Sequence, residues 1–146
     1  MQLPWYVTAL GAAVVWGIHY PLVDNALKKV SLFSVLLLTA LPILLVSVVY
    51  VRQLQLDYAA LRALAPGAQL TVLSLALTRL LGTVLLYVSI GGKNATLASL
   101  IEISYPVFVA VFAWVLFREL HVNASVLLGA ALVFAGVGLI IFNNPH

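Results

Sequence analysis

The sequence predicts an all-α integral membrane protein with five membrane-spanning helices. Hydrophobic residues make up 64% of the chain and charged residues only 8%, against about 45–50% and about 25% in soluble domains. The apolar residues are gathered into five long runs, at residues 5–23, 32–51, 70–90, 95–117 and 122–142. An apolar helix of about 20 residues, rising about 1.5 Å per residue, matches the roughly 30 Å hydrocarbon core of a bilayer.

The connections between these runs predict one transmembrane domain over residues 1–146. Three of them, at residues 24–31, 91–94 and 118–121, are short enough to make consecutive helices antiparallel neighbours. The longer connection, residues 52–69, fits either a short interfacial helix ended by Pro66-Gly67 or a solvated loop. The N-terminus has no basic region ahead of its apolar run, so we do not expect a cleaved signal peptide. The expected location is a plasma membrane, specifically a prokaryotic inner membrane.

Several classes of chemistry have no support in the sequence. There is no cysteine, so neither a disulfide framework nor a cysteine metal site is expected. The histidines His19, His121 and His146 lack the spacing of metal ligands. No hydrolase, kinase or metalloprotease motif is present. We therefore expect no enzyme activity, no cofactor and no metal, and the net charge of +3, spread over separate loops, does not indicate nucleic-acid binding.

Two ionisable residues fall inside predicted spans, Arg79 in the third and Glu102 in the fourth. Intramembrane charges are costly and usually face a partner or a cavity. Counted from the turn at residues 91–94, Arg79 is about 16 Å deep and Glu102 about 11 Å deep, so the two side chains could pair. They either neutralise each other between helices, or Glu102 binds a proton or cation while Arg79 tunes it or holds an anion.

Pro106 and His19 are two further features of the predicted spans that could contribute to a site. Pro106 is the residue at i+4 from Glu102 and has no N–H, so it frees the carbonyl of Glu102 from the helix. A loosened backbone beside an intramembrane carboxylate is one way in which membrane proteins build a site at mid-depth. His19, near the end of the first span, either contacts a polar substrate or relays a proton, or is an interfacial histidine with a hydrated edge.

Four segments resemble one protein family. They are Trp16-Gly17, the stretch from Glu102 to Phe108 (EISYPVF), Phe117-Arg118-Glu119, and the stretch from Leu128 to Val137 (LGAALVFAGV). In this order and spacing they are similar to an EamA-type repeat of the drug/metabolite transporter superfamily. The resemblance covers essentially the whole chain. It implies a transporter of small solutes that works by alternating access.

The resemblance also implies a particular assembly. Most similar proteins carry ten helices as two five-helix repeats, so this chain resembles the half-size members. Because five is odd, two such repeats fused in tandem lie inverted in the membrane, and a lone repeat can rebuild that arrangement only with an inverted copy. Basic residues are balanced between the two membrane faces, three against three, so no excess fixes one orientation. These six residues are Arg52, Arg62 and Arg118 on one face and Lys28, Lys29 and Lys93 on the other.

We therefore expect an antiparallel, dual-topology homodimer of ten helices, with the cavity between helices one to four of the two copies. Four-helix relatives carry a functional glutamate in the first helix, where this chain has His19 instead, so Glu102 is the candidate substitute. The expected function is secondary active transport, driven by a proton or solute gradient because no ATP-binding motif is present. The alternatives are an accessory subunit or lipid flippase component that acts with a different partner chain, and a structural or regulatory membrane protein.

The expected site residues share a position inside the spans. Glu102 would couple transport or bind substrate charge, and Arg79 would be its partner or an anion contact. His19, Trp16 and Tyr105 would line the cavity, although aromatic residues in membrane helices often serve packing alone. Together Arg79 and Glu102 suit a zwitterionic solute. The expected partners are a small-molecule substrate, the lipid bilayer and a second copy of the chain.

Overall fold

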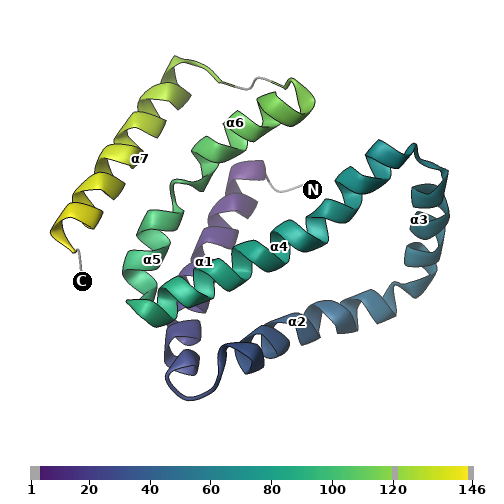
Figure 1. Ribbon diagram of the computed structural model, residues 1–146, viewed down its shortest axis with the longest axis horizontal. Helices are drawn as coiled ribbons and strands as arrows, with labels where there is room; N and C mark the ends of the chain where they lie inside the picture. Colours follow the sequence, from purple (N-terminus) through teal and green to yellow (C-terminus); the bar gives the residue numbers. More distant parts are fainter. Residues whose placement is uncertain (1–3, 120–121, 145–146) are drawn as a thin grey trace. The chain divides into compact units, whose positions relative to one another are not determined.

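The computed structural model describes residues 4–119 and 122–144, and all regular elements in these ranges are α-helices. In chain order they are α1 (Trp5–Leu27), α2 (Leu32–Val49), α3 (Val51–Ala63), α4 (Pro66–Gly92), α5 (Ala95–Glu102), α6 (Tyr105–Phe117) and α7 (Ala124–Asn143) (Figure 1). Within the described residues, five stretches are long and apolar enough to cross a membrane, namely Tyr6–Leu27, Leu32–Val49, Pro66–Gly92, Ala95–Phe117 and Ala124–Asn143. The predicted all-α class with five spans is confirmed.

The chain divides into two compact units, one made of Met1–Leu22 with Ser89–His146 and the other of Val23–Val88. In the first unit, α5 packs against α7, and Ile90, Ala95, Ala98 and Val137 are buried. In the second unit, Val23, Val35 and Tyr87 are buried. No more than 11% of the most apolar window of any span is buried within the chain. The apolar side chains therefore point outward, as they must where lipid or other helices cover them.

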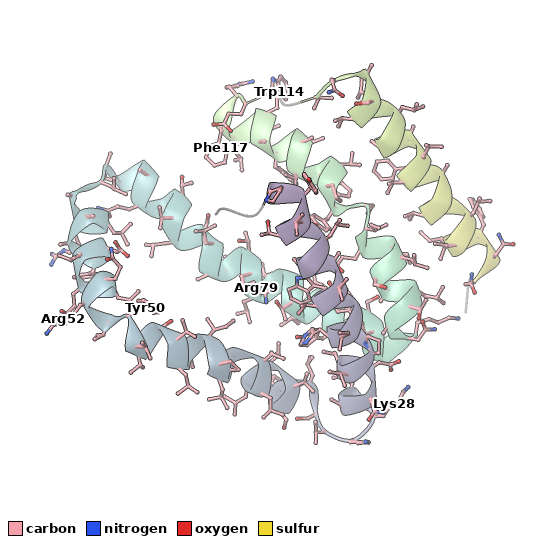
Figure 2. All side chains as sticks on the ribbon, turned by 180° about the vertical axis from the view of Figure 1, so that it is seen from behind. Lys28, Tyr50, Arg52, Arg79, Trp114 and Phe117 are labelled. Carbon is pink, nitrogen blue, oxygen red and sulfur yellow. The ribbon has the colours of Figure 1, made fainter. Side chains whose placement is uncertain are left out.

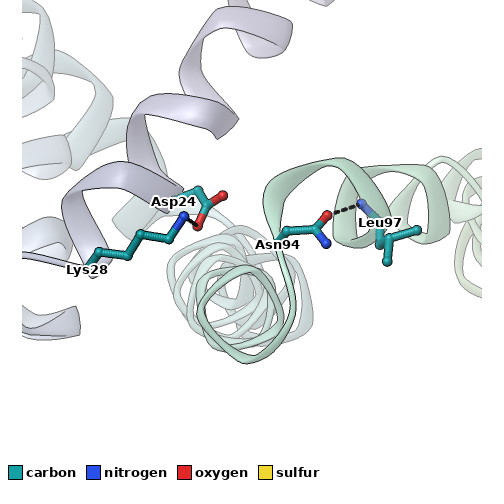
Figure 3. A network of polar contacts seen from close by, with 4 residues as sticks. All are labelled: Asp24, Lys28, Asn94 and Leu97. Carbon is teal, nitrogen blue, oxygen red and sulfur yellow. Dashed lines mark hydrogen bonds and ion pairs between the residues drawn. The ribbon is translucent and has the colours of Figure 1, made fainter. Parts of the chain in front are cut away.

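Two spans extend beyond their predicted ends. Helix α1 runs on to Leu27, past the predicted end at Val23. Here the Lys28 Nζ lies 3.1 Å from the Asp24 Oδ1, one helical turn away (Figure 3), and an acid-to-base pair at i,i+4 favours helix. Helix α4 begins at Pro66, before the predicted start at residue 70. Proline suits the first helical position, where no N–H is needed, so this proline starts a helix.

The connection at residues 52–69 was predicted to be either a short helix or a loop, and most of it is a helix. Helix α3 has 13 residues, longer than the one or two turns expected, and its residues are mostly exposed. Polar pairs lie along it: the Gln53 amide donates to the Asp57 carboxylate at 2.9 Å, and the Arg62 guanidinium lies 5.7 Å from the centre of the Tyr58 ring. Figure 2 shows Tyr50 and Arg52 at the corner between α2 and α3. A helix with this mixture of apolar and charged residues suits the membrane interface.

The fourth span is broken, which corrects the prediction of one continuous helix over residues 95–117. Helix α5 ends at Glu102 and α6 begins at Tyr105, with Ile103 and Ser104 between them in a turn (Figure 1). The Ser104 N–H donates to the Ile101 carbonyl at 3.2 Å and the Val107 N–H to the Ser104 carbonyl at 3.1 Å. These are i→i−3 bonds, typical of a short 3₁₀ turn.

The break also places Pro106 at the start of a helix. In α6 this proline occupies the first turn, where its missing N–H removes no helical bond within α6. The Ser104 hydroxyl donates to the Ile101 carbonyl at 2.9 Å, which satisfies a group at the end of α5. The sequence signal was therefore correct about the loosened backbone, although the span tightens into a turn and restarts.

Hydrogen bonds cap the end of α6 and the start of α7. Helix α6 ends at Phe117, and Arg118 adopts a left-handed conformation with φ 58°. This conformation costs a non-glycine residue about 1–2 kcal/mol. Its N–H donates to the Trp114 carbonyl at 3.0 Å, and its guanidinium lies 5.3 Å from the centre of the Trp114 ring. Helix α7 begins after Asn123, whose side chain accepts from the Val126 N–H at 3.0 Å.

Candidate functional site

Helix α1 carries three ring side chains on one face, at Trp16, His19 and Tyr20. The spacing i, i+3 and i+4 places them beside one another on a helix. The Trp16 and His19 ring centres are 5.2 Å apart in an edge-on arrangement, and the Trp16 and Tyr20 ring centres are 5.5 Å apart. Both His19 and Tyr20 are half-buried. This group is therefore a compact patch of aromatic and imidazole surface within the first span.

Glu102 joins this patch from a distant part of the sequence. The Tyr20 hydroxyl donates a hydrogen bond of 2.7 Å to the Glu102 Oε2, between residues 82 apart in the chain. Glu102 is half-buried. A length of about 2.7 Å is usual for an O–H···O hydrogen bond. We call Trp16, His19, Tyr20 and Glu102 the aromatic–glutamate cluster.

The cluster lies directly beside the break in the fourth span. Glu102 is the last residue of α5, and Ile103 and Ser104 form the turn that follows it. Because Pro106 at i+4 has no N–H, the Glu102 carbonyl lacks the donor that a continuous helix would give it. Both the side chain and the main chain of Glu102 are thus placed where polar groups are needed to satisfy them within an apolar span.

Residues 3–142 match the EamA-like transporter family. The chain belongs to that family. No curated protein and no solved structure matches it. This EamA-family chain is therefore a multi-pass membrane protein of a transporter family, and its five spans fit one five-helix repeat.

The structure brings some of the predicted site residues together. Glu102, His19 and Trp16, proposed from the sequence as separate candidates, lie in one cluster through Tyr20. Sequence reasoning did not select Tyr20 as a site residue. The signal that could have found it was its position at i+4 from Trp16 on the face that carries His19.

Other predicted residues lie elsewhere. Tyr105 begins α6, beyond the break, with 58% of its surface exposed. Within the ranges that the structure describes, neither a hydrogen bond nor a ring contact joins Tyr105 to the cluster. Arg79 is in the middle of α4, in the other compact unit (Figure 2). The predicted Arg79–Glu102 pair would join the two units and stays a prediction.

The chemistry that this arrangement offers is binding and proton exchange. A carboxylate beside aromatic faces can hold a proton, or the ammonium group of a solute through charge and cation–π attraction. Among the described residues, no three His, Asp or Glu side chains are grouped to hold a metal ion. His121 and His146 lie outside the described residues.

Proposed function

We propose that this EamA-family protein is a secondary active transporter that carries a small metabolite or drug-like solute by alternating access. In this proposal, Glu102 binds either a coupling proton or the positive group of the solute. The observation that supports it best is the hydrogen bond from Tyr20 to Glu102, made within the membrane at the point where the fourth span is interrupted. An ionisable group in a span, satisfied by a polar partner beside a broken helix, is the arrangement from which membrane transporters build their sites.

The hydrogen bond between Tyr20 and Glu102 could couple ligand binding to a helix movement. The Glu102 carboxylate accepts the Tyr20 hydroxyl in the structure, and a proton or a solute ammonium at the same oxygen would replace that bond. Losing it would release α1 from α5. The 3₁₀ turn at Ile103 and Ser104 already has a shortened bonding pattern, so α6 could change its angle to α5 without breaking a regular helix.

The remaining predicted residues have places in the same proposal. His19 would relay protons or contact a polar group of the solute, and Trp16 would present an aromatic face to a cation. Tyr105 would line the solute path from α6. Arg79 would bind a negative group, either on the solute or on Glu102. A site that offers both an arginine and a glutamate suits a zwitterion such as an amino acid.

The assembly that we propose is an antiparallel homodimer in a prokaryotic inner membrane. The balanced basic residues support it because nothing in the loops selects one orientation. The test uses the absence of cysteine: an Asn144→Cys variant carries one thiol at the end of α7. We expect a membrane-impermeant thiol reagent to label about half of the protein in intact cells. Complete labelling or none would contradict dual topology and would favour a different partner chain.

Transport itself is tested in liposomes that contain the purified protein and a pH-sensitive dye. The probes are neutral, basic and acidic amino acids, together with tetramethylammonium as a simple organic cation. We expect one of these classes to drive proton movement that requires the protein. The Glu102→Gln variant should abolish that movement, whereas the matched variant Glu119→Gln, outside the helices, should keep it. Proton movement that survives Glu102→Gln, or none with any probe, would contradict the proposal.

A further inference from the structure

A second feature of the first compact unit is a groove between α6 and α7, which begins at Ile103 and Pro106 beside the break and runs to Trp114. Its volume is about 470 Å³, and all of its lining residues are apolar. We call it the α6–α7 groove. Its lining includes the following residues of both helices: Val107, Ala110 and Trp114 from α6, and Val126, Ala130 and Val133 from α7.

The size of the groove limits what can occupy it. Small-molecule sites in proteins have volumes of about 300–1,000 Å³. A flexible apolar chain fits a groove of this volume with an entirely apolar lining. In a bilayer, the acyl chain of a phospholipid is the flexible apolar chain at hand.

One end of the groove carries a positive charge. Trp114 lines the groove, and the Arg118 guanidinium lies over the Trp114 ring at 5.3 Å from its centre. Arg118 directly follows the last residue of α6, the helix whose last turn carries Trp114 and Phe117 (Figure 2). Aromatic residues at the end of a span are typical of the membrane interface. Within residues 4–119 and 122–144, no carboxylate lies at ion-pair distance from this guanidinium. An arginine is well suited to a phosphate group because its N–H donors match two oxygens at once.

We propose that the α6–α7 groove binds an anionic phospholipid, with one acyl chain between the two helices and the phosphate on Arg118. The apolar lining and the charge at its mouth match the two chemically different parts of such a lipid. Free phosphate would gain nothing from the apolar lining. The groove adjoins the break through Ile103 and Pro106, but its ligand differs from the transported solute, and its test needs no transport activity.

The test measures how a lipid quenches the fluorescence of Trp114. Trp5→Phe and Trp16→Phe leave Trp114 as the only tryptophan, because the chain has three. The protein is placed in phosphatidylcholine vesicles that contain a varied fraction of phosphatidylglycerol or phosphatidylcholine with brominated acyl chains. Bromine quenches only at contact, so the quenching curves give the relative association of each lipid with the groove. We expect phosphatidylglycerol to associate about five-fold more strongly, the factor that one basic residue near a membrane surface supplies.

Two variants and their controls decide the origin of that preference. Arg118→Gly should reduce the ratio to about one, and glycine suits the left-handed backbone there, so this variant should fold. The neighbouring Glu119→Gln should keep the preference. Ala130→Leu, which fills the groove, should lower quenching by both lipids, whereas Leu132→Phe, outside the groove lining on the same helix, should not.

Three results would overturn the proposal. The first is equal association of the two brominated lipids with the protein that has only Trp114. The second is a preference for phosphatidylglycerol that persists in Arg118→Gly. The third is weak quenching by both lipids, since this would mean that another protein segment, such as a second copy of the chain, covers the groove.

Discussion

Arg79 and Glu102 each lie inside a span, and the two spans differ in their backbone. Helix α4 has 27 residues and continues without a break through Arg79. The fourth span stops directly after Glu102 and restarts at Tyr105. A charged residue, which is energetically costly inside a membrane, therefore lies on an intact helix in one span and at a helix end in the other.

Hydrogen bonds explain the difference. In α4 the Thr83 hydroxyl donates to the Arg79 carbonyl at 2.8 Å, in addition to the regular helical bonds. At the equivalent position after Glu102 the chain has Pro106, which offers no donor at all. The comparison suggests that a charge within a span becomes a site where the backbone beside it is also freed. In the proposed transport cycle, the fourth span is accordingly the part that moves.

The largest expected effect separates the two charges. Glu102→Gln should reduce solute-driven proton movement to background, because an amide cannot take up the proton. Arg79→Gln should keep proton movement but weaken apparent solute affinity about ten-fold, as expected for the loss of a hydrogen bond to a charged group. Both are measured in the dye-containing liposomes. An equal loss of proton movement in the two variants would contradict the different roles given to the two spans.

Restoring the helix is expected to have the next largest effect. Pro106→Ala supplies an N–H for the Glu102 carbonyl, and one such hydrogen bond contributes about 1 kcal/mol net. The variant should therefore unfold at a higher temperature, while its transport rate falls about ten-fold because the turn stiffens. Pro42→Ala is the matched control, since α2 continues through that proline. A Pro106→Ala variant that transports at the normal rate would show that the break is not needed.

The smallest expected effect concerns the hydroxyl that holds Glu102. Tyr20→Phe removes one hydrogen bond, and a net contribution of about 1 kcal/mol corresponds to about a five-fold fall in transport rate. Tyr50→Phe makes the same chemical change on an exposed ring at the end of α2, outside the cluster and the proposed solute path, and should leave the rate unchanged. Similar rates in the two variants would show that the Tyr20 bond does not contribute.

The sequence predicted the architecture well because lipid imposes a simple requirement. Five apolar runs of bilayer length must be helices, since the backbone polar groups have no other partner in hydrocarbon. The helix ends were less accurate. Pro66 was expected to end a helix and instead starts one, because proline is favourable at a first helical position and unfavourable within a helix.

The candidate site was predicted only in part. Glu102 is recognisable because charge is rare in a span, and Pro106 gave the reason for a loosened backbone beside it. Tyr20 could not be chosen in the same way, because its partner is 82 residues away and depends on how α1 packs beside α5. Tyr105 was chosen for its closeness in sequence to Glu102, but the turn at Ile103 and Ser104 separates the two residues.

The most direct test of this account asks whether water reaches the break in the fourth span. Ser104 and Ser74 form a matched pair, since each hydroxyl donates to the carbonyl at i−3 within a span, at 2.9 Å and 2.7 Å. In this cysteine-free chain, Ser104→Cys and Ser74→Cys each create one thiol, and the rates of labelling by a water-soluble thiol reagent are compared in membranes. The account predicts that Ser104→Cys is labelled at least ten-fold faster. Equal rates, or faster labelling of Ser74→Cys, would contradict the assignment of the transport site to the broken span.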